Sequence, residues 1–379
     1  MPTWRKFAHK AYHCGWYEGE DVFCNSDDVD LIQLEPSKRF GFTELWHRRL
    51  VWRDRSQRLA YVNPGLRTIR LKNEYDLLFV HCQTWWELFY LNAIEGWKDH
   101  CKTSVCWIDE LWAADLPHYK YWIQSLRRFD HVFVGLAGTV AALSDVIERQ
   151  CHYLPAAVDA LRFTPYPTPP PRVIDAYSMG RRREQIHREL LKLAEMNRIF
   201  YLYDTMHTGG STVPDYRQHR DLLANLAKRS RYFLVAPARL GAPEETQGQI
   251  EIGFRYYEAA AAGAVMLGQA PDCEAFRYAF DWPDSVIEIK PDGSDLREVW
   301  ERFAEEPERL TQISRRNTAE ALRRHDWGHR WGRLLDIAGL APTPALQDRE
   351  RRLRELADTA LQGGDARMQI NHPTPSLSL

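Results

Sequence analysis

The stretch Gly253-Phe254-Arg255-Tyr256-Tyr257-Glu258-Ala259-Ala260-Ala261-Ala262-Gly263-Ala264-Val265-Met266-Leu267 combines a helix pattern with a strand pattern. Four consecutive alanines are the strongest helix formers and carry small side chains. Gly263 ends the helix pattern, and an apolar segment of strand length follows. We predict a helix with a smooth surface, which either packs tightly against its neighbours or lets a ligand approach closely, followed by a buried strand.

Three apolar segments upstream have the length of buried strands, and helix-length segments separate them. The predicted strands cover residues 75–81, 103–108 and 131–135, and the helices cover 85–97 and 119–129. Almost wholly apolar strands that alternate with helices are typical of a parallel sheet covered on both faces. Residues before about position 74 contain no motif that we can assign.

A proline-rich segment separates this series from a second one. Six prolines lie between Pro155 and Pro171. Proline has a fixed φ and no N–H group, so the segment should form no helix and should follow a stiff path. A second α/β series follows, with predicted helices over 184–196 and 216–229 and strands over 198–203 and 232–237.

The quoted stretch belongs to the second series, after a loop of about a dozen residues, which is long for a compact unit. A strand over 286–289 and helices over 296–304, 308–324 and 325–337 follow it. We therefore predict an α/β protein with two domains and a C-terminal helical segment. The predicted boundaries are 1–165 for the N-terminal domain, 166–340 for the C-terminal domain, and 341–379 for a helical extension with a flexible tail.

The composition is that of an ordinary soluble protein, with 379 residues, 44% hydrophobic and 27% charged. A formal net charge of -2 argues against a dedicated nucleic-acid binder but leaves a local basic patch open. Seven scattered cysteines suggest reduced thiols, and no apolar run approaches the length of a membrane span. We expect a cytoplasmic protein. The aromatic and basic mixture around Trp4, Arg5 and Trp16 leaves peripheral contact with a membrane open, although an ordinary first strand also accounts for it.

Two motifs resemble those of glycosyltransferases with the GT-B fold. Leu154-Pro155-Ala156-Ala157-Val158-Asp159, followed by Arg162-Phe163-Thr164-Pro165, is similar to their interdomain segment. The stretch from Gly253 to Leu267 resembles their donor-binding helix, in the form found in group 1 (family 4-like) members that include the spore-maturation CgeB-like proteins. The resemblance implies two Rossmann-like domains facing each other across a cleft. The second domain would hold a nucleotide-diphosphate sugar and the first a hydroxyl-bearing acceptor.

The resemblance implies roles for several residues of the second domain. Glu258 matches the glutamate that accepts hydrogen bonds from the donor ribose, because two carboxylate oxygens suit a vicinal diol. Arg255 is the first candidate to meet the diphosphate, although a surface salt bridge would also explain it. Further candidates for the donor are Arg239, the backbone N–H groups of Gly209 and Gly210, and His207. Many retaining members carry an earlier glutamate that contacts the sugar; Ile250 stands at that position, so Glu251, Gln249 or the main chain around Gly253 is expected to take the role.

In the first domain, Asp109 and His81 each follow a predicted strand, where relatives place groups near the acceptor. Either could orient or deprotonate the acceptor hydroxyl, or could be a hydrogen-bonded structural residue. Together with His207 and Arg255 they are the predicted catalytic residues. The family's front-face mechanism needs neither a protein nucleophile nor a metal, so we expect no cofactor beyond the donor.

The prediction is a glycosyltransferase that moves a sugar from a nucleotide-diphosphate donor to a hydroxyl acceptor with retention. Two alternatives remain open. One is a sugar-nucleotide epimerase or phosphorylase-like enzyme of the same fold. The other is a non-catalytic sugar-nucleotide binding protein, which Ile250 at the expected glutamate position would fit.

Overall fold

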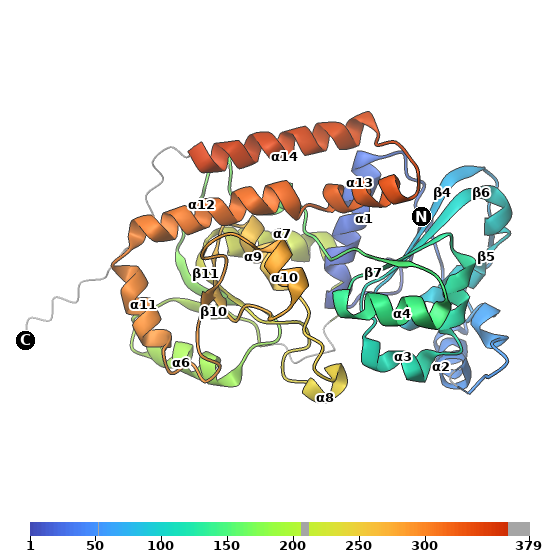
Figure 1. Cartoon of the computed structure of the whole chain (residues 1–379), viewed down its shortest axis with the longest axis horizontal. Helices are drawn as coiled ribbons and strands as arrows, with labels where there is room; N and C mark the ends of the chain where they lie inside the picture. Colours follow the sequence, from blue (N-terminus) through green and yellow to red (C-terminus); the bar gives the residue numbers. More distant parts are fainter. Residues whose placement is uncertain (52, 206–211, 363–379) are drawn as a thin grey trace, which may run out of the picture.

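The computed structural model describes residues 1–51, 53–205 and 212–362 of the chain. It contains two α/β domains side by side, each built on a parallel sheet (Figure 1). This architecture confirms the predicted α/β fold class and is that of a two-domain GT-B protein.

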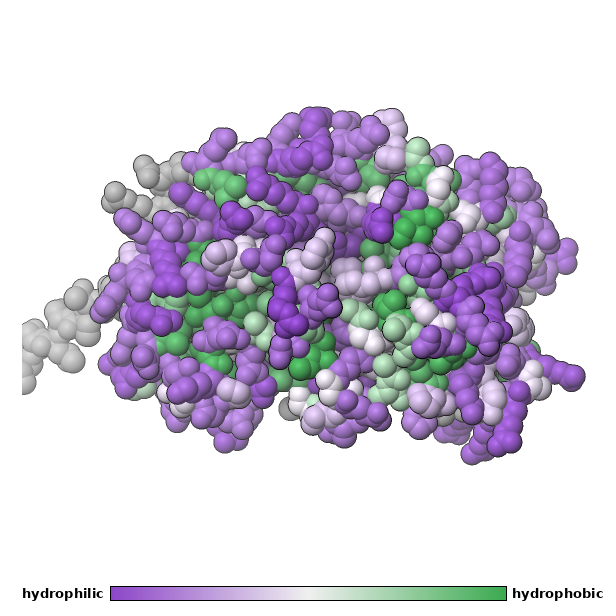
Figure 2. Space-filling view, in the orientation of Figure 1, coloured by the Kyte–Doolittle hydropathy of each residue, from purple (hydrophilic) through white to green (hydrophobic). Residues whose placement is uncertain are grey.

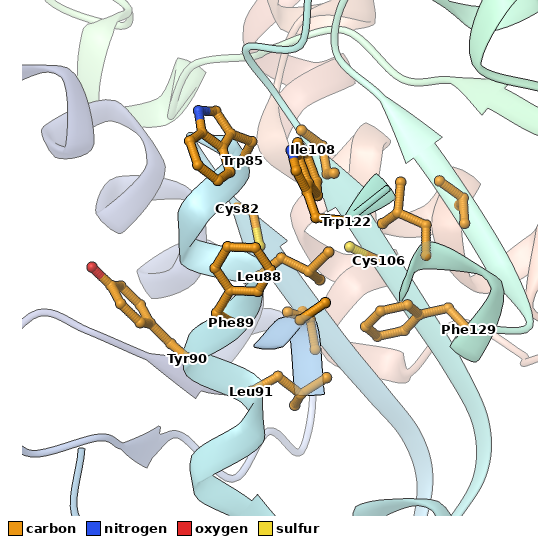
Figure 3. Close-up of a cluster of buried hydrophobic side chains, with 14 of the residues drawn as sticks. Cys82, Trp85, Leu88, Phe89, Tyr90, Leu91, Cys106, Ile108, Trp122 and Phe129 are labelled. Carbon is orange, nitrogen blue, oxygen red and sulfur yellow. The ribbon is translucent and has the colours of Figure 1, made fainter. Parts of the chain in front are cut away.

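The sheet of the N-terminal domain has four parallel strands in sequential spatial order. The strands are β4 (Tyr75–Cys82), β6 (Cys101–Ile108), β7 (His131–Val134) and β8 (Cys151–Tyr153). Side chains alternate between the two faces, so Leu78 and Val80 pack in one apolar cluster and Phe79 in another. Figure 3 shows part of the first cluster, where Trp85, Phe89 and Trp122 pack over Cys82 and Ile108. Both faces of the sheet are therefore buried.

Short elements surround this sheet. The helices are α1 (Cys14–Ser26), α2 (Phe40–Val51), α3 (Leu116–Tyr119) and α4 (Val140–Ile147). Two-residue strands pair in parallel as β1 (Pro2–Thr3) with β2 (Ile32–Gln33), and as β3 (Ile69–Arg70) with β5 (Ile94–Glu95). Helix α1 lies between the domains in Figure 1, next to α7 and α13. At Gly15 of α1 an added side-chain carbon would lie 2.7 Å from Cζ of Phe254, so only glycine allows this approach.

The sheet of the C-terminal domain has five parallel strands in the order β10-β9-β11-β12-β13. Their bounds are β9 (Ile174–Ser178), β10 (Tyr201–Tyr203), β11 (Ser230–Val235), β12 (Val265–Gly268) and β13 (Ile287–Glu288). The chain leaves β9 for β10 on one side and then crosses to β11 on the other. The carboxyl ends of β9 and β11 therefore form a topological switch point, where open α/β sheets bind ligands.

Helices cover both faces of the second sheet. One apolar cluster buries the alanines of α9 (Phe254–Ala261) against the sheet together with residues of α5 (Ala160–Phe163), α7 (Tyr216–Lys228) and α12 (Pro307–Arg324). The opposite face is covered by α6 (Glu184–Glu195) and α11 (Leu296–Ala304). The remaining short helices are α8 (Pro243–Thr246) and α10 (Glu274–Ala279). Hydrophobic residues show through the hydrophilic exterior in the middle of both halves (Figure 2).

The chain crosses between the domains twice, and an ion cluster joins the crossings. Val158 exchanges backbone hydrogen bonds of 3.0 and 3.1 Å with His325 and Trp327. After this point α13 (Trp327–Ile337) packs on the N-terminal sheet, although it falls within the range 166–340 predicted for the C-terminal domain. Helix α14 (Pro344–Gln362) then returns along α12 (Figure 1). From α14, Arg349 binds Asp159 at 2.6 Å and Asp326 at 2.7 Å, which ties both crossings together.

Three local expectations were wrong. Residues 85–97 form a 3-10 helix, Trp85–Ala93, with a two-residue strand instead of one α-helix. Within 119–129 the main helical element is a 3-10 helix, Ile123–Arg128. Helix α5 lies inside the proline-bearing segment, in a stretch free of proline where Asp159 accepts a bond from the Arg162 N–H. Strands β8 and β9 were not predicted. Within the described ranges, no helix combines the length and apolarity needed to cross a bilayer.

Candidate functional site

A pocket lies at the switch point of the C-terminal sheet. Its walls come from the ends of β9, β11 and β12, with Ser178, Val235 and Gly268 among the lining residues, and from the start of α6. Three consecutive arginines, Arg181, Arg182 and Arg183, line the same pocket. The carboxyl ends of the strands thus meet a strongly basic loop.

The loop after β9 is held in a defined shape. Gly180 has a φ of +83° and donates its N–H to Oδ2 of Asp204 at 2.8 Å. Arg182 binds the same carboxylate at 2.8 Å and the Asp204 carbonyl at 2.9 Å, whereas Arg183 binds Oε1 of Gln269 at 2.9 Å. Arg181 is exposed and pairs with no other residue in the described part of the chain. Guanidinium groups beside the free N–H groups of a helix start are well suited to an anion.

Helix α9 adds a further arginine to this edge. A side-chain carbon placed on Gly180 would lie 3.8 Å from Nη2 of Arg255, so the Arg255 guanidinium lies directly against the basic loop. Its Nη1 pairs with the carboxylate of Glu258, one turn further along α9. The structure therefore brings Arg255 to the edge where Arg181 to Arg183 gather.

Glu258 lies at the centre of a buried ion network. Its carboxylate has no exposed surface, and one oxygen pairs with Arg255 while the other pairs with Arg220 of α7. Arg220 also binds both oxygens of Glu18 from α1, at 2.7 and 3.1 Å. Burial alone would raise the pKa of Glu258, but the two guanidinium groups outweigh it and lower that pKa below its usual value. The predicted contact with a ribose stays a prediction; here the carboxylate holds two arginines.

Two predicted donor-site residues bridge to the other domain. Glu251 is buried, and its carboxylate accepts the N–H groups of Ala137 at 3.0 Å and Gly138 at 2.7 Å, which follow β7. Arg239, which follows β11, binds Oε1 of Glu110 at 3.0 Å, next to the end of β6. The carboxyl edges of the two sheets therefore face each other.

Gly253 has a steric role at the start of α9. A side-chain carbon there would lie 2.6 Å from the carbonyl oxygen of Ala236, so the helix can approach the end of β11 only with glycine. Ile250 is 41% exposed and borders this segment. The predicted residues His207, Gly209 and Gly210 lie outside the described residues.

On the N-terminal edge, Asp109 and His81 meet around Trp16 of α1. The Trp16 Nε1–H donates to Oδ2 of Asp109 at 3.1 Å, and the Trp16 ring stacks on His81 with 3.8 Å between centroids. Gln83 donates a second bond to Asp109 at 2.8 Å. A side chain on Gly135 would lie 2.5 Å from Asp109 Oδ1, so glycine is needed there.

Both titratable groups of this edge are biased toward their neutral forms. Burial, reinforced by the charge of Glu110, raises the pKa of Asp109 to about 8. Burial also lowers the pKa of His81 well below its usual value, and its Nε2 atom lacks a hydrogen-bond partner among the described residues. The edge thus holds one carboxyl group that can carry a proton near neutral pH, packed against buried aromatic rings.

A second cavity, of about 600 Å³, lies at the opposite end of the N-terminal sheet. Its lining includes Tyr75 at the start of β4, together with Asp27, Asp28 and Asp30. In the described residues no cluster of three or more His, Cys, Asp or Glu side chains is arranged to hold a metal ion. The expectation of metal-independent chemistry stays a prediction.

The sequence interpretation missed several residues of the site. The run Arg181 to Arg183 follows a strand and opens a helix, which is a signal that could have been found once β9 was recognised. Glu18 and Arg220 carried no such signal, because they are 202 positions apart in the sequence.

The sequence of the C-terminal domain is similar to that of a known protein family. Residues 182–336 match a family model described as glycosyl transferase-like, and this range contains most of the C-terminal domain with α9 and the basic loop. The match supports a glycosyltransferase group 1-like family, in agreement with the resemblance seen in the sequence. A search of curated proteins found no match to the chain.

Proposed function

We propose that this protein transfers a glycosyl group from a nucleotide-diphosphate sugar, held at the C-terminal switch point, to a hydroxyl acceptor at the N-terminal edge. The observation that carries the proposal is the gathering of Arg181, Arg182, Arg183 and Arg255 at the carboxyl edge of the sheet. A leaving diphosphate gains negative charge as the glycosidic bond breaks, and prearranged cations stabilise that charge. The glycosyl transferase-like match over this domain supports the same reaction class.

Asp109 is proposed to act on the acceptor. With a pKa of about 8, its carboxyl group exchanges a proton readily near neutral pH, which suits a group that accepts a proton from a hydroxyl. The stacked rings of Trp16 and His81 are buried beside it, 2% and 5% exposed, so they hold the carboxyl group in place. We propose retention of configuration, with no protein nucleophile and no metal, following the family resemblance.

A panel of UDP-, GDP-, dTDP- and ADP-sugars tests this function. Each donor is incubated with the full chain, and mass spectrometry follows slow hydrolysis without an acceptor. We expect one donor base to be hydrolysed above the others and to raise the melting temperature. Hydrolysis of none, together with no thermal shift by any donor, would contradict the proposal.

A non-catalytic sugar-nucleotide binder is the second candidate. One observation favours it: the Glu251 carboxylate is occupied by the N–H groups of Ala137 and Gly138, and Ile250 stands where relatives keep a sugar-contacting glutamate. The same panel separates the two functions. A thermal shift with one nucleotide, but neither hydrolysis nor transfer of its sugar, would favour the binder. Nucleotide turnover without acceptor-dependent release would instead indicate the epimerase or phosphorylase-like alternative.

A further inference from the structure

Helix α2 of the N-terminal domain has two different faces. Its inner face packs on the domain, where His47 and Val51 are buried and the Phe40 ring lies 5.0 Å from that of Phe7. The outer face carries four large apolar side chains that are 44 to 68% exposed: Phe42, Leu45, Trp46 and Leu50. These positions are three and four residues apart, so they form one continuous stripe.

This stripe differs from the isolated apolar residues found on any protein surface. The rings of Phe42 and Trp46 lie 6.1 Å apart on the helix, and Tyr61 and Val62, shortly after it, are also about half exposed. A contiguous apolar surface in water is unfavourable and usually marks an interaction site. The α2 stripe, defined as Phe42, Leu45, Trp46 and Leu50, therefore requires an occupant.

The charge around the stripe identifies the kind of occupant. Residues 37–62 contain seven basic and two acidic side chains, a formal charge of +5 in a chain whose total is -2. Both acids are engaged locally: Glu44 with Arg48 and Tyr90, and Asp54 with Ser56 and the Leu59 N–H. Exposed cations border the stripe instead, namely Lys38, Arg39, Arg49, Arg53, Arg55 and Arg58.

We infer that α2 docks the protein on an anionic lipid surface. A helix with aromatic and leucine side chains on one face and arginines beside them inserts its apolar groups at the headgroup boundary, while the cations meet lipid phosphates. A second copy of the chain fits less well, because a two-fold contact would bring the two +5 segments face to face. Nucleic acid would meet the arginines but would leave Leu45 and Leu50 without an apolar partner.

This inference does not rest on the proposed function. Figure 1 places α2 at the outer edge of the N-terminal domain, away from the basic loop and α9 of the other domain. The two surfaces can therefore be altered separately.

Co-sedimentation of the full chain with vesicles tests the inference. Vesicles of phosphatidylcholine mixed with phosphatidylglycerol are compared with vesicles of phosphatidylcholine alone. We expect binding to the anionic vesicles that weakens as salt is added, and at most weak binding to the neutral ones.

Two double variants separate the apolar and the electrostatic contributions. F42S/W46S should lower the partition coefficient roughly tenfold or more, because it removes the two rings that enter the lipid. R49S/R53S should lower it by about tenfold or more, since each cation near an anionic surface contributes about a fivefold factor. The matched control is M196S/F200S, whose side chains are 53 and 54% exposed on the other domain; it should bind as the parent does. Circular dichroism and the melting temperature verify folding of each variant.

Four outcomes would overturn the inference. They are no binding to anionic vesicles, equal binding to neutral vesicles, unchanged binding by both α2 variants, and an equal loss in the M196S/F200S control. Two further measurements identify a different occupant: light scattering that shows a dimer abolished by F42S/W46S, or nucleic-acid binding lost in R49S/R53S without any vesicle binding.

Discussion

The carboxyl edges of the two sheets face each other, but they stabilise their buried titratable groups in opposite ways. On the C-terminal edge, Arg255 and Arg220 pair with the buried carboxylate of Glu258 and lower its pKa, so this group stays ionised. On the N-terminal edge, none of the described residues places a cation against Asp109. Burial raises the pKa of Asp109 and lowers that of His81, so both groups favour their neutral forms. A buried group must either be paired or lose its charge. Pairing on the C-terminal edge gives fixed positive charges that can bind an anion. Loss of charge on the N-terminal edge gives a carboxyl group that can exchange a proton.

Among the residues of the C-terminal ion network, substitution of Arg220 should lower stability the most, because Arg220 pairs with two buried carboxylates. Arg220→Ala leaves the carboxylates of Glu18 and Glu258 buried without their shared partner. Removing one member of a buried ion network costs about 3–5 kcal/mol. We expect a fall in melting temperature of about 10 °C, measured by calorimetry. Arg188→Ala, which breaks an exposed pair with Glu184, is the control and should change it by less than about 2 °C.

Replacing the carboxylates of Glu18 and Glu258 with amides should restore stability that Arg220→Ala loses. The triple variant with Glu18→Gln, Arg220→Met and Glu258→Gln removes the three buried charges and leaves the partly exposed Arg255 without its partner, so much of the stability should return. If Arg220→Ala melts like the parent, the paired network does not hold the C-terminal edge.

Proton exchange by Asp109 on the N-terminal edge should appear in the dependence of kcat/KM on pH. The base form of Asp109 is the carboxylate, so the acceptor-dependent kcat/KM should rise with pH and level off above about 8. Asp109→Asn should abolish this rise and lower the rate about 10³-fold, the usual range for a positioned acid or base.

Glu110→Gln sharpens this test. The charge of Glu110 helps to raise the pKa of Asp109, so the variant should shift the rise to lower pH without abolishing it. A profile that is flat from pH 6 to 9 in the parent would remove Asp109 from the proposed role.

The positive charges of the C-terminal edge should affect kcat more than donor affinity. Arg255→Ala should lower kcat about 10²-fold and weaken donor affinity much less, because the diphosphate charge grows in the transition state. Arg255→Lys should retain part of the rate. Arg277→Ala, in an exposed pair with Asp272, should have no effect. Equal losses in kcat and affinity would mean that Arg255 only binds the donor.

The smallest change in stability is expected for Glu251, which joins the two sheet edges through its bonds to Ala137 and Gly138. Glu251→Gln replaces one of the two oxygens that accept N–H bonds with an NH₂ group, which cannot accept the second bond. We expect a loss of about 1–2 kcal/mol in stability and a larger radius of gyration in small-angle scattering. Glu244→Gln, at an exposed position of α8, should leave both unchanged. An unchanged radius in Glu251→Gln would argue that other contacts hold the domains together.

The sequence predicted the long periodic elements well, because local patterns determine them. The strands of the two main sheets other than β8 and β9, and helices such as α7, α9 and α12, lie within a few residues of their predicted ranges. Strand β9 escaped because Ile174–Ser178 is short and follows a proline-rich segment. Helices α1 and α2 escaped because their apolar residues face two different surroundings, so neither shows a single buried stripe.

The site was predicted less completely than the fold. Arg255 and Glu258 could be proposed from the sequence because they share one helix with a recognisable pattern, and Asp109 and His81 because they follow strands. The pairing of Glu18 with Arg220, the bond between Glu251 and Gly138, and the contact of Trp16 with Asp109 arise only from tertiary structure. A single sequence carries no local signal for such contacts.

Titration calorimetry with a nucleoside diphosphate and its parent nucleoside tests the central claim most directly. The base is the one chosen by the donor panel. If the arginines of the C-terminal edge hold a diphosphate, the diphosphate should bind at least about 100-fold more tightly than the nucleoside, and added salt should reduce this difference. Equal affinities for the two ligands, insensitive to salt, would contradict the account.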